Sequence, residues 1–380
     1  MKILQLTGDW KWTGPAEPMV RLAEALRARG LQVALAYPAP PHGVEPARSL
    51  ASEAKAAGLP SVVPVEAGQG ARWRRDAAAV ARLRDYLDRS DIDLIHCWHT
   101  RDHLMAIRAA RARRRAGRTV VVRSYRSAGR IPRHPWNRWL FGAGTDGLLC
   151  VSPGTAHANA SLRGGRPMIG CLGAVDLGRF RPAPRDAALR RELGLAAEHR
   201  VVGVVARMQR HRRFDLLLAA AVRLFAADPL ARLLVVGRGT HAEGVAVQPA
   251  RRLGIADRVV FAGYRTGDLA AVLLQMDLIT MLVPGSDGTC RALLEGAASG
   301  VPAVTTRRGA LPEIVIDGET GCLVDEDPEA LAAAWIGLLA DEPARRRLGA
   351  AARQRAETHF DPAGWASRVA AFYEEVRASV

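Results

Sequence analysis

The stretch PGSDGTCRALLEGAASGVP, from Pro284 to Pro302, decides our interpretation of this chain. An apolar run, Leu278–Val283, precedes it and predicts a buried strand. Residues Arg291–Ser299 are good helix formers with apolar positions on one side, and Gly300 and Pro302 end the helix. A strand, a glycine-containing turn and a helix direct backbone N–H groups and the positive end of a helix dipole at one point. The stretch therefore predicts a binding site for phosphate.

Two carboxylates flank the start of this predicted helix. Asp287 precedes the helix, and Glu295 lies within it, eight positions later. At this spacing the two side chains can reach different hydroxyls on either side of a bound diphosphate. A nucleotide-sugar offers ribose hydroxyls, a diphosphate and sugar hydroxyls in that arrangement. The alternative is a solvated aspartate in a loop and a glutamate on a helix surface.

The stretch resembles the donor-site signature of retaining glycosyltransferases of the GT-B fold, the family 4 type (group 1 glycosyltransferases). The flanking sequence GAASGVPAVTTRRGALPEIVIDGETGCLV is also similar to that family. The resemblance implies that Asp287, which is shorter than the usual Glu, binds the transferred sugar, and that Glu295 binds the ribose. The residues that it places beside the phosphates are Gly288, Thr289, Cys290 and Arg291.

The length and the order of apolar runs predict two α/β domains. A chain of 380 residues exceeds the usual single core. Each half alternates short apolar runs with helical patterns, which predicts doubly wound parallel sheets. With the resemblance, we expect two Rossmann-like domains that face each other across a cleft: residues 1–178 for the acceptor and 186–361 for the donor. The linker is predicted near 177–185, and the helix 362–380 is expected to pack back on the first domain.

The predicted elements are as follows. In the first half we expect strands at Ile3–Thr7, Gln32–Ala36, Val62–Val65, Leu94–Cys97, Thr119–Val122 and Gly147–Val151, and helices at Ala16–Arg29, Arg74–Asp88 and His103–Ala116. In the second half we expect further strands at Val201–Ala206, Leu233–Val236, Val259–Ala262 and Ala303–Thr305, and helix from Pro328 to Val380.

Other donor contacts are implied by the resemblance at the ends of other predicted strands. Arg207 and Arg212 occupy the positions of the family's two diphosphate-binding cations, the second with a planar guanidinium in place of an ammonium group. The alternative is a pair of surface arginines. Gly14 matches the glycine loop that closes over the acceptor and the donor phosphates; the alternative is an ordinary helix N-terminus beside Pro15. The remaining donor-side positions are Gly237, Tyr264 and Arg265.

The acceptor side depends on residues after two strands of the first half. The segment DLIHCWHTRDH ends a strand, and strand ends bind ligands in open α/β sheets. We assign His99 to the acceptor and expect His96 in the core. Tyr125 and Arg126 stand where many relatives carry a histidine after the next strand. Neither is a general base at neutral pH. This departure fits a mechanism without an enzymic nucleophile, and it also fits an anionic acceptor or donor held by Arg123, Arg126 and Arg130.

Composition limits the class and the location of the protein. Hydrophobic residues make up 49% of the chain, yet no apolar run approaches the ~20 residues that span a bilayer. The start, MKILQLTGDW, indicates a buried strand rather than a signal peptide. The five cysteines are scattered without a CxxC pair, which disfavours zinc and favours a reducing cytoplasm. The resemblance implies no metal and no other cofactor, since the nucleoside-diphosphate sugar is a substrate.

The net charge of +16 is carried almost entirely by arginine, and one basic block stands out. Twelve arginines and one acid lie between Arg101 and Arg138, close to an aromatic and apolar group: Trp136, Trp139, Leu140 and Phe141. This pattern predicts contact with an anionic membrane surface. The alternative is a solvated helix face with buried aromatics. We therefore expect a cytoplasmic enzyme, peripheral on the inner membrane, with a lipid-linked or lipopolysaccharide-like acceptor of the cell envelope.

Three other functions account for parts of the sequence. A GT-B-fold epimerase would use the same nucleotide-sugar site without an acceptor. A dehydrogenase would use Gly237, Gly239 and Ala242 as G-x-G-x-x-A, but this pattern follows the second strand of its half instead of the first. A nucleic-acid-binding protein would explain the charge but not the acid pair, and no recognition module is present. We expect no nucleic-acid partner.

Overall fold

The computed structural model describes residues 1–12, 14–41, 49–63, 65, 73–112, 118–127, 129–265, 267–285 and 288–380, with only the backbone for residues 73–75. The chain forms two compact units. The N-terminal unit comprises Met1–Gly173 and Pro362–Val380, and the C-terminal unit comprises Ala174–Asp361. Each unit contains one six-stranded sheet.

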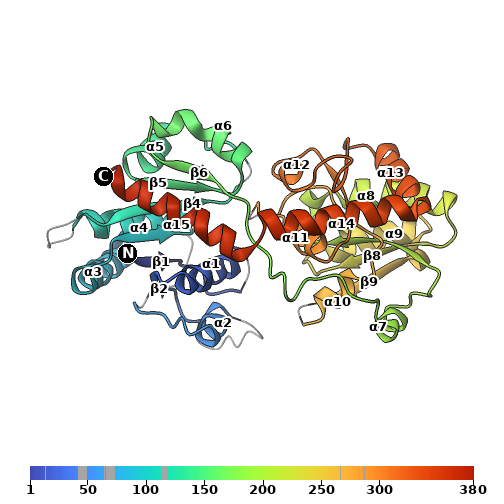
Figure 1. The fold of residues 1–380 in the computed structure, drawn as a ribbon, viewed down its shortest axis with the longest axis horizontal. Coiled ribbons are helices and arrows are strands. Elements are labelled where there is room, and N and C mark those ends of the chain that lie inside the picture. The colour runs from blue at the N-terminus through green and yellow to red at the C-terminus, as the bar shows by residue number, and fades with distance from the viewer. Residues whose placement is uncertain are drawn as a thin grey trace. The chain divides into compact units, whose positions relative to one another are not determined.

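The sheet of the N-terminal unit is wholly parallel and has the strand order β2-β1-β3-β4-β5-β6 (Figure 1). After β1 the chain adds β2 on one side and then returns to add the later strands on the other side. Such a reversal creates a topological switch point between β1 and β3, where open α/β sheets bind ligands. The strands are β1 (Lys2–Leu6), β2 (Gln32–Ala36), β3 (Leu94–Cys97), β4 (Val120–Tyr125), β5 (Gly147–Cys150) and β6 (Met168–Gly170).

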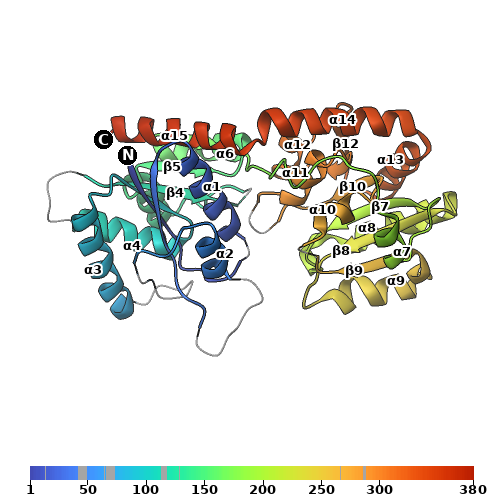
Figure 2. The same cartoon turned by 60° about the horizontal axis from the view of Figure 1, so that its bottom comes forward.

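Helices cover both faces of this sheet (Figure 2). One face packs on α3 and α4 in a continuous apolar cluster. The C-terminal helix α15 packs against β5, where a Cβ on Gly147 would lie 2.6 Å from Val376 and 3.0 Å from Phe372. The helices are α1 (Ala16–Ala28), α2 (Leu50–Ala56), α3 (Trp73–Ser90), α4 (Thr100–Arg111), α5 (Pro135–Arg138), the π-turn η1 (Trp139–Ala143), α6 (Pro153–Arg163) and α15 (Pro362–Ala378).

The sheet of the C-terminal unit repeats this plan, with the strand order β12-β11-β10-β7-β8-β9 and only parallel pairs. Its switch point lies between β7 and β10, which are neighbours in the sheet although two strands separate them in the chain. The strands are β7 (Arg200–Val205), β8 (Ala231–Val236), β9 (Val259–Gly263), β10 (Leu278–Met281), β11 (Ala303–Thr306) and β12 (Gly321–Val324).

The core of the C-terminal unit contains α8, α13 and the apolar side chains of the central strands. Trp335 is fully buried there, and its indole N–H donates to the hydroxyl of Thr280 at 2.9 Å, which satisfies the one polar atom of the ring. The helices are α7 (Ala187–Glu192), η2 (Arg210–Arg212), α8 (Phe214–Ala227), η3 (Glu243–Val247), α9 (Gln248–Arg252), η4 (Ala256–Arg258), α10 (Leu269–Leu273), α11 (Arg291–Ala298), α12 (Leu311–Ile314), α13 (Pro328–Ala340) and α14 (Glu342–His359).

The two parallel sheets confirm the predicted α/β class with two Rossmann-like domains. The predicted strand Val62–Val65 is wrong over its described residues, none of which is in a strand. Ser61, just before them, makes an isolated bridge to Leu35. Pro64 interrupts that run and cannot donate to a sheet, which explains the error. The sequence analysis also missed β6 and β12, because these are short edge strands that carry glycine and are only partly buried.

The division between the units differs from the predicted one. The N-terminal unit ends at Gly173 rather than at residue 178, and the predicted linker 177–185 falls within the C-terminal unit. The N–H of Val175 donates to the carbonyl of Phe360, and Arg353 donates to the carbonyl of Phe180. These hydrogen bonds attach the connecting segment to the region of α14, so it packs as part of the second unit.

Candidate active site

The predicted donor residues of the C-terminal unit follow neighbouring strands. Arg207 comes after β7, Gly237 after β8 and Tyr264 after β9, while residues 288–291 come after β10. Since these strands are parallel and adjacent in the order β10-β7-β8-β9, their carboxyl ends lie at one edge of the sheet. That edge includes the switch point between β7 and β10, so the structure brings the predicted donor residues to the position where this class of sheet binds ligands.

Two arginines follow β7 and differ in how the protein holds them. Arg212, at the end of η2, donates Nη1–H to the carbonyl of Val283 at 3.1 Å. This bond connects the segment after β7 with the segment after β10, across the switch point. Arg207 is exposed, and within the described chain no hydrogen bond or ion pair engages its side chain. The Arg212 side chain is therefore anchored, and the Arg207 side chain can turn towards an anionic ligand.

The segment after β10 leads into a helix, α11. Gly288 has a left-handed φ of 66° and donates its N–H to Gly285 at 2.8 Å. Cys290 is also left-handed, with φ 47°, and is the N-cap of α11. The first N–H groups of a helix have no acceptor within that helix, so the N-terminus of α11 can bind an anion. Residues 286–287 lie outside the described residues, so the role of Asp287 stays a prediction.

Glu295 lies on α11 and is only 7% exposed. Its Oε1 is 3.7 Å from Nε of Arg291, one turn earlier on the same helix. The alternative of a glutamate on a helix surface is therefore wrong. A buried carboxylate is costly unless a partner compensates it, and this one stands in the helix whose first residues carry the predicted phosphate contacts.

Gly237 and Gly239 let the loops after β7 and β8 approach each other closely. A Cβ on Gly237 would lie 2.1 Å from the carbonyl oxygen of Ala206, and one on Gly239 would lie 2.2 Å from that of Met208. Gly237 also donates its N–H to Gly263 at 2.8 Å. In this unit the close packing of the two loops therefore accounts for the glycines, which a dehydrogenase would use to bind a dinucleotide.

Tyr264 and Arg265 follow β9 and are placed differently. Tyr264 is 52% exposed, with the guanidinium of Arg238 4.4 Å from its ring centre. Arg265 donates to the carbonyl of Ala262 and forms ion pairs with Asp268 and Glu192. Those bonds occupy the Arg265 side chain, so a ligand at this loop meets the Tyr264 ring and the loop backbone.

A buried polar cluster lies at the carboxyl ends of β3 and β4 in the N-terminal unit. His99, the N-cap of α4, donates its backbone N–H to Oδ2 of Asp102 at 3.1 Å. Arg123, near the end of β4, donates to the carbonyl of Cys97 at 3.3 Å. Of the buried side-chain atoms without a hydrogen-bond partner in the described chain, three belong to these residues: Nε2 of His99, Oδ1 of Asp102 and Nε of Arg123. Unsatisfied buried groups of this kind are rare, and they indicate a ligand position.

The charge states of this cluster follow from burial. Burial, reinforced by the nearby Arg123 charge, lowers the pKa of His99 to about 4. Burial raises the pKa of Asp102 to about 7, against the opposing effect of Arg123. At neutral pH the His99 imidazole is therefore uncharged, and it can accept a hydrogen bond from a hydroxyl or donate one.

The other predicted acceptor-side residues lie beside this cluster. The Arg126 guanidinium is 5.3 Å from the ring centre of Trp98, whose indole N–H donates to Gln5 at 3.1 Å. Tyr125 packs edge-on against Phe141, with 5.9 Å between ring centres, so its ring contacts the apolar core. Gly14, after β1, has a left-handed φ of 59° that favours glycine in this turn.

The histidines of the DLIHCWHTRDH segment do not converge. His96 is fully buried, as the sequence predicts, with Tyr373 and Ser124 each 2.7 Å from one of its ring nitrogens. His103 lies on α4, and its Nε2 is 2.6 Å from the hydroxyl of Thr145, which comes just before β5. Among the residues that the structure describes, no three His, Cys, Asp or Glu side chains lie together as metal ligands would.

Both halves of the chain match models of glycosyltransferase domains. Residues 199–341 match glycosyl transferases group 1, and residues 14–167 match glycosyltransferase family 4. Each half of the chain is thus similar to a glycosyltransferase domain. HepE from Anabaena, solved in complex with UDP and glucose, aligns with a TM-score of 0.79 over 98% of this chain and 99% of that chain. At 21% identity this likeness shows the GT-B fold alone.

The chain is also similar to curated relatives over part of their length. A D-inositol 3-phosphate glycosyltransferase from Segniliparus rotundus is 40% identical over 184 residues, which is 47% of this chain and 40% of that protein. A GDP-mannose-dependent α-(1-6)-phosphatidylinositol monomannoside mannosyltransferase from Mycolicibacterium smegmatis is 34% identical over 208 residues, 53% of each protein. The chain thus spans about half the length of the curated relatives it matches.

Sequence reasoning missed Asp102 as a residue of the N-terminal cluster, and it named Arg123 only as one of the cations for an anionic ligand. The spacing of His99 and Asp102 is that of a helix cap and its N3 residue, which was a detectable signal. Arg123 follows an apolar run in β4, and a cation in such a position requires an anionic or carbonyl partner. Both signals were obscured by the many other arginines of this region.

Residues of the predicted membrane contact divide into exposed and buried groups. Trp136 is 47% exposed, and its ring centre lies 5.1 Å from that of the half-buried Trp139. Leu140 and Phe141 are buried, so the prediction that they face a membrane is wrong; η1 turns both towards the core. Arginines 113–115 lie outside the described residues. Of the helices described, none combines the length and the hydropathy that a bilayer span requires.

Acidification from pH 7 to pH 5.5 is expected to destabilise the N-terminal unit. Burial, reinforced by Arg123, lowers the pKa of His96 to about 3, of His99 to about 4 and of His103 well below its ordinary value. The unfolded chain protonates these groups near pH ~6.5. The stabilisation that they provide is therefore complete above that pH and is lost as the pH falls towards the folded pKa values.

Asp102 acts in the opposite direction, because its raised pKa means that the folded state gains a proton first as the pH falls towards 4. Because three imidazoles destabilise the folded state on acidification and one carboxyl stabilises it, the free energy of unfolding should fall by roughly 2 kcal/mol. Hydrogen exchange of the β3 and β4 amides at the two pH values measures this loss. Asp102→Asn should steepen it, and replacing the exposed His157 by Gln should not change it. Equal protection at both pH values would contradict the prediction.

Proposed function

We propose that this protein transfers a sugar from a nucleoside-diphosphate sugar to an acceptor hydroxyl and retains the configuration at the anomeric carbon. The observation that carries this proposal is the arrangement at the switch point of the C-terminal unit. Arg207 and Arg212 follow β7, and the N-terminus of α11, with the buried Glu295, follows β10. These groups suit a diphosphate and a neighbouring ribose. The group 1 match covers the same unit.

In this proposal the donor is activated by stabilising its leaving group. The diphosphate gains charge as the bond to the sugar breaks, and fixed cations and helix dipoles aimed at that charge lower the barrier. Arg212 is anchored for this role by Val283, and Arg207 can turn towards the phosphates. Glu295 binds the ribose and Asp287 binds the transferred sugar. The other donor contacts proposed are Gly14, Gly237, Tyr264, Arg265, Gly288, Thr289, Cys290 and Arg291.

The acceptor is proposed to bind the polar cluster of the N-terminal unit. His99, neutral at pH 7, contacts the acceptor hydroxyl. The proton of that hydroxyl passes to the departing phosphate, so no enzymic general base is required. Arg123 and Arg126 favour an acceptor with an anionic group near that hydroxyl, and Tyr125 borders it. The names of the two curated relatives describe acceptors that carry a phosphate, which supports an anionic acceptor for this chain.

We infer further that the acceptor is lipid-linked or lipopolysaccharide-like, and that the protein works in the cytoplasm at an anionic inner-membrane surface. The exposed Trp136 and the arginines of the surrounding block support this proposal. Sedimentation with anionic vesicles, weakened by salt and by replacement of arginines 113–115 with serine, is its expected sign.

The reaction is tested by incubating the purified protein with UDP-, GDP-, ADP- and CMP-sugars and a phosphorylated polyol or glycolipid acceptor. We expect one donor to release its nucleotide only when an acceptor is present, with a product of the same anomeric configuration as the donor. NMR coupling constants of the product report that configuration, and an inverted product would refute the mechanism. Conversion of the donor sugar without an acceptor would instead show an epimerase.

A further inference from the structure

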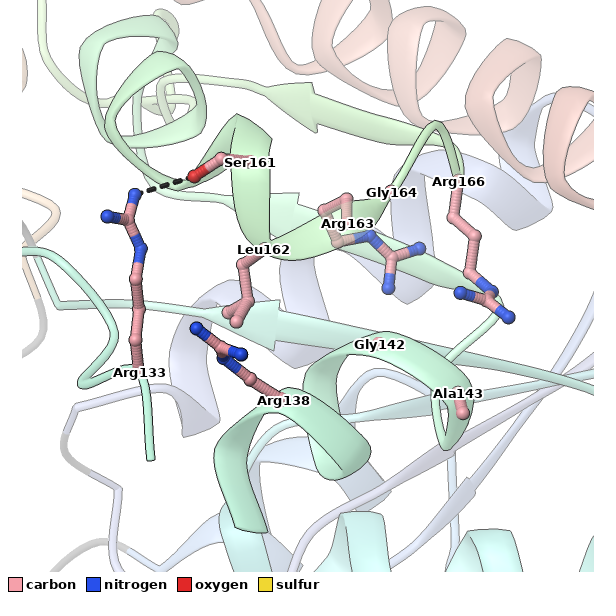
Figure 3. Close-up of a pocket in the computed structure, with 9 residues that line it drawn as sticks. All are labelled: Arg133, Arg138, Gly142, Ala143, Ser161, Leu162, Arg163, Gly164 and Arg166. Atoms are coloured by element: carbon pink, nitrogen blue, oxygen red, sulfur yellow. Dashed lines mark hydrogen bonds between the residues drawn. The ribbon is translucent and has the colours of Figure 1, made fainter. Parts of the chain in front are cut away.

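A cavity of about 500 Å³ lies on the N-terminal unit and is unusually basic (Figure 3). It lies between the C-terminal end of α6 and the segment of α5 and η1. We call it the arginine pocket. Four of its nine lining residues are arginines and none is acidic; the nine are Arg133, Arg138, Gly142, Ala143, Ser161, Leu162, Arg163, Gly164 and Arg166.

Arg163 forms the rigid base of this pocket. It is 1% exposed, and its guanidinium donates to the carbonyls of Phe141, Thr145, Asp146 and Pro167. These bonds hold the side chain in place. Among the described residues, the one carboxylate whose charge acts on Arg163 is that of Asp146, which pairs with Arg118 and does not line the pocket. Burial, together with the nearby charge of Arg166, lowers the pKa of Arg163 to about 10, so it remains a cation at neutral pH.

The other three arginines provide donors for a ligand. Arg133 is positioned by Ser161, whose hydroxyl oxygen accepts from Nη2 at 2.6 Å and whose hydrogen stays available. No hydrogen bond or ion pair in the described chain engages the guanidinium of Arg138 or Arg166. Figure 3 shows Arg138 beside Leu162 and the Arg166 group close to that of Arg163. Four arginines and no carboxylate line the pocket, so their charges repel one another there, and an anion of two or more charges would relieve that repulsion.

The arginine pocket is distinct from the candidate active site. Gly142 and Ala143 precede β5, and Arg163 and Arg166 precede β6, so the pocket lies at the amino ends of these strands. The polar cluster around His99 lies at the carboxyl ends of β3 and β4, the opposite edge of the same parallel sheet. A ligand in the arginine pocket is therefore a second ligand.

We propose that the arginine pocket binds a phosphomonoester or diphosphate group. Planar guanidiniums match phosphate oxygens in pairs, and three or more of them around one cavity favour a dianion over a single carboxylate. The cavity has room for such a group. The phosphate could belong to a soluble molecule or to the headgroup of a lipid. The exposed Trp136, two residues before Arg138, would favour the lipid, because indoles prefer the headgroup level of a membrane.

The test uses full-length protein with Arg207→Ala and Arg212→Ala as background, so that the proposed donor site does not bind the probes. Calorimetry measures inorganic pyrophosphate binding, and sedimentation compares vesicles of phosphatidic acid, a phosphomonoester, with vesicles of phosphatidylglycerol, a phosphodiester. Adding Arg138→Ala and Arg166→Ala should weaken binding of the preferred probe about tenfold or more. The matched control is Arg29→Ala with Arg89→Ala, which removes two exposed arginines of the same unit and the same net charge.

Each outcome decides the proposal. Pocket-dependent binding of pyrophosphate without a preference for phosphatidic acid indicates a soluble phosphate ligand. A pocket-dependent preference for phosphatidic acid indicates a lipid headgroup. Equal binding by the pocket variant and its control, or no binding of any probe by the background protein, overturns the proposal. Because every readout is binding in a chain with the proposed donor site removed, the result does not depend on the proposed transferase activity.

Discussion

Replacing Arg207 or Arg212 with alanine is expected to lower the turnover of sugar transfer by ~10²–10³-fold, while the protein stays folded. Both arginines follow β7 at the switch point, where they would meet the charge that grows on the leaving diphosphate. A preorganised cation acts most strongly on the transition state, so the loss should appear in kcat more than in KM. Steady-state kinetics with saturating acceptor measures the effect.

The two variants differ in their structural cost, and this difference gives a control. Arg212→Ala also removes the hydrogen bond to Val283, whereas Arg207 has no such bond in the described chain. Arg212→Lys should restore part of the activity, because it keeps the charge but not the fork. Arg252→Ala removes an exposed arginine of α9 and should change nothing. Full activity of Arg207→Ala and Arg212→Ala would refute the donor site.

Replacing Asp76 with alanine is expected to lower the free energy of unfolding of the N-terminal unit by about 3–5 kcal/mol. Asp76 on α3 accepts from Nε and Nη2 of Arg101 on α4 at 3.0 and 2.6 Å, and both side chains are buried. Without the carboxylate, the Arg101 cation remains away from water with its main partner missing. Urea unfolding, monitored by hydrogen exchange of the α3 and α4 amides, measures the loss of unfolding free energy.

Removing the whole pair should cost far less than breaking it. Asp76→Leu combined with Arg101→Met replaces both charges with apolar groups, and buried pairs treated in this way often lose little stability. The exposed pair of Arg84 and Asp85 is the matched control, since Asp85→Ala should change stability by less than about 1 kcal/mol. A loss below that value for Asp76→Ala would contradict the prediction.

Most of the fold was predictable because its strands are short apolar runs bounded by turns. The central strand β3 is buried on both faces, so it could be located to the residue from hydrophobicity alone. The edge strand β2 could also be located, because three of its five residues are buried. The edge strands β6 and β12 could not, because an edge strand depends on one neighbour and needs little apolar character. The predicted strand at Val62–Val65 failed because hydrophobicity does not register a missing N–H donor.

The residues of the candidate site could be predicted from the sequence to a similar extent. Residues of the donor side follow strand ends, and their order along the chain sufficed to assign them to one sheet edge. The burial of charged residues could not be predicted from the sequence. In the sequence Glu295 and Arg123 look like any surface charge, and only the packed structure shows that both side chains are buried. The same holds for Leu140 and Phe141, which a linear pattern associates with Trp136 but which η1 directs into the core.

The sequence by itself determined the two parallel sheets, their helices and the segment after β10 to which the phosphate contacts are assigned by prediction, because local propensity and hydrophobic period specify each of these features. The tertiary structure alone decided which charges are buried, which atoms lack partners and which distant arginines share one cavity. Those properties depend on contacts between segments far apart in the chain. Arg133 and Ser161, 28 residues apart, meet at the arginine pocket only because α5 and α6 pack together.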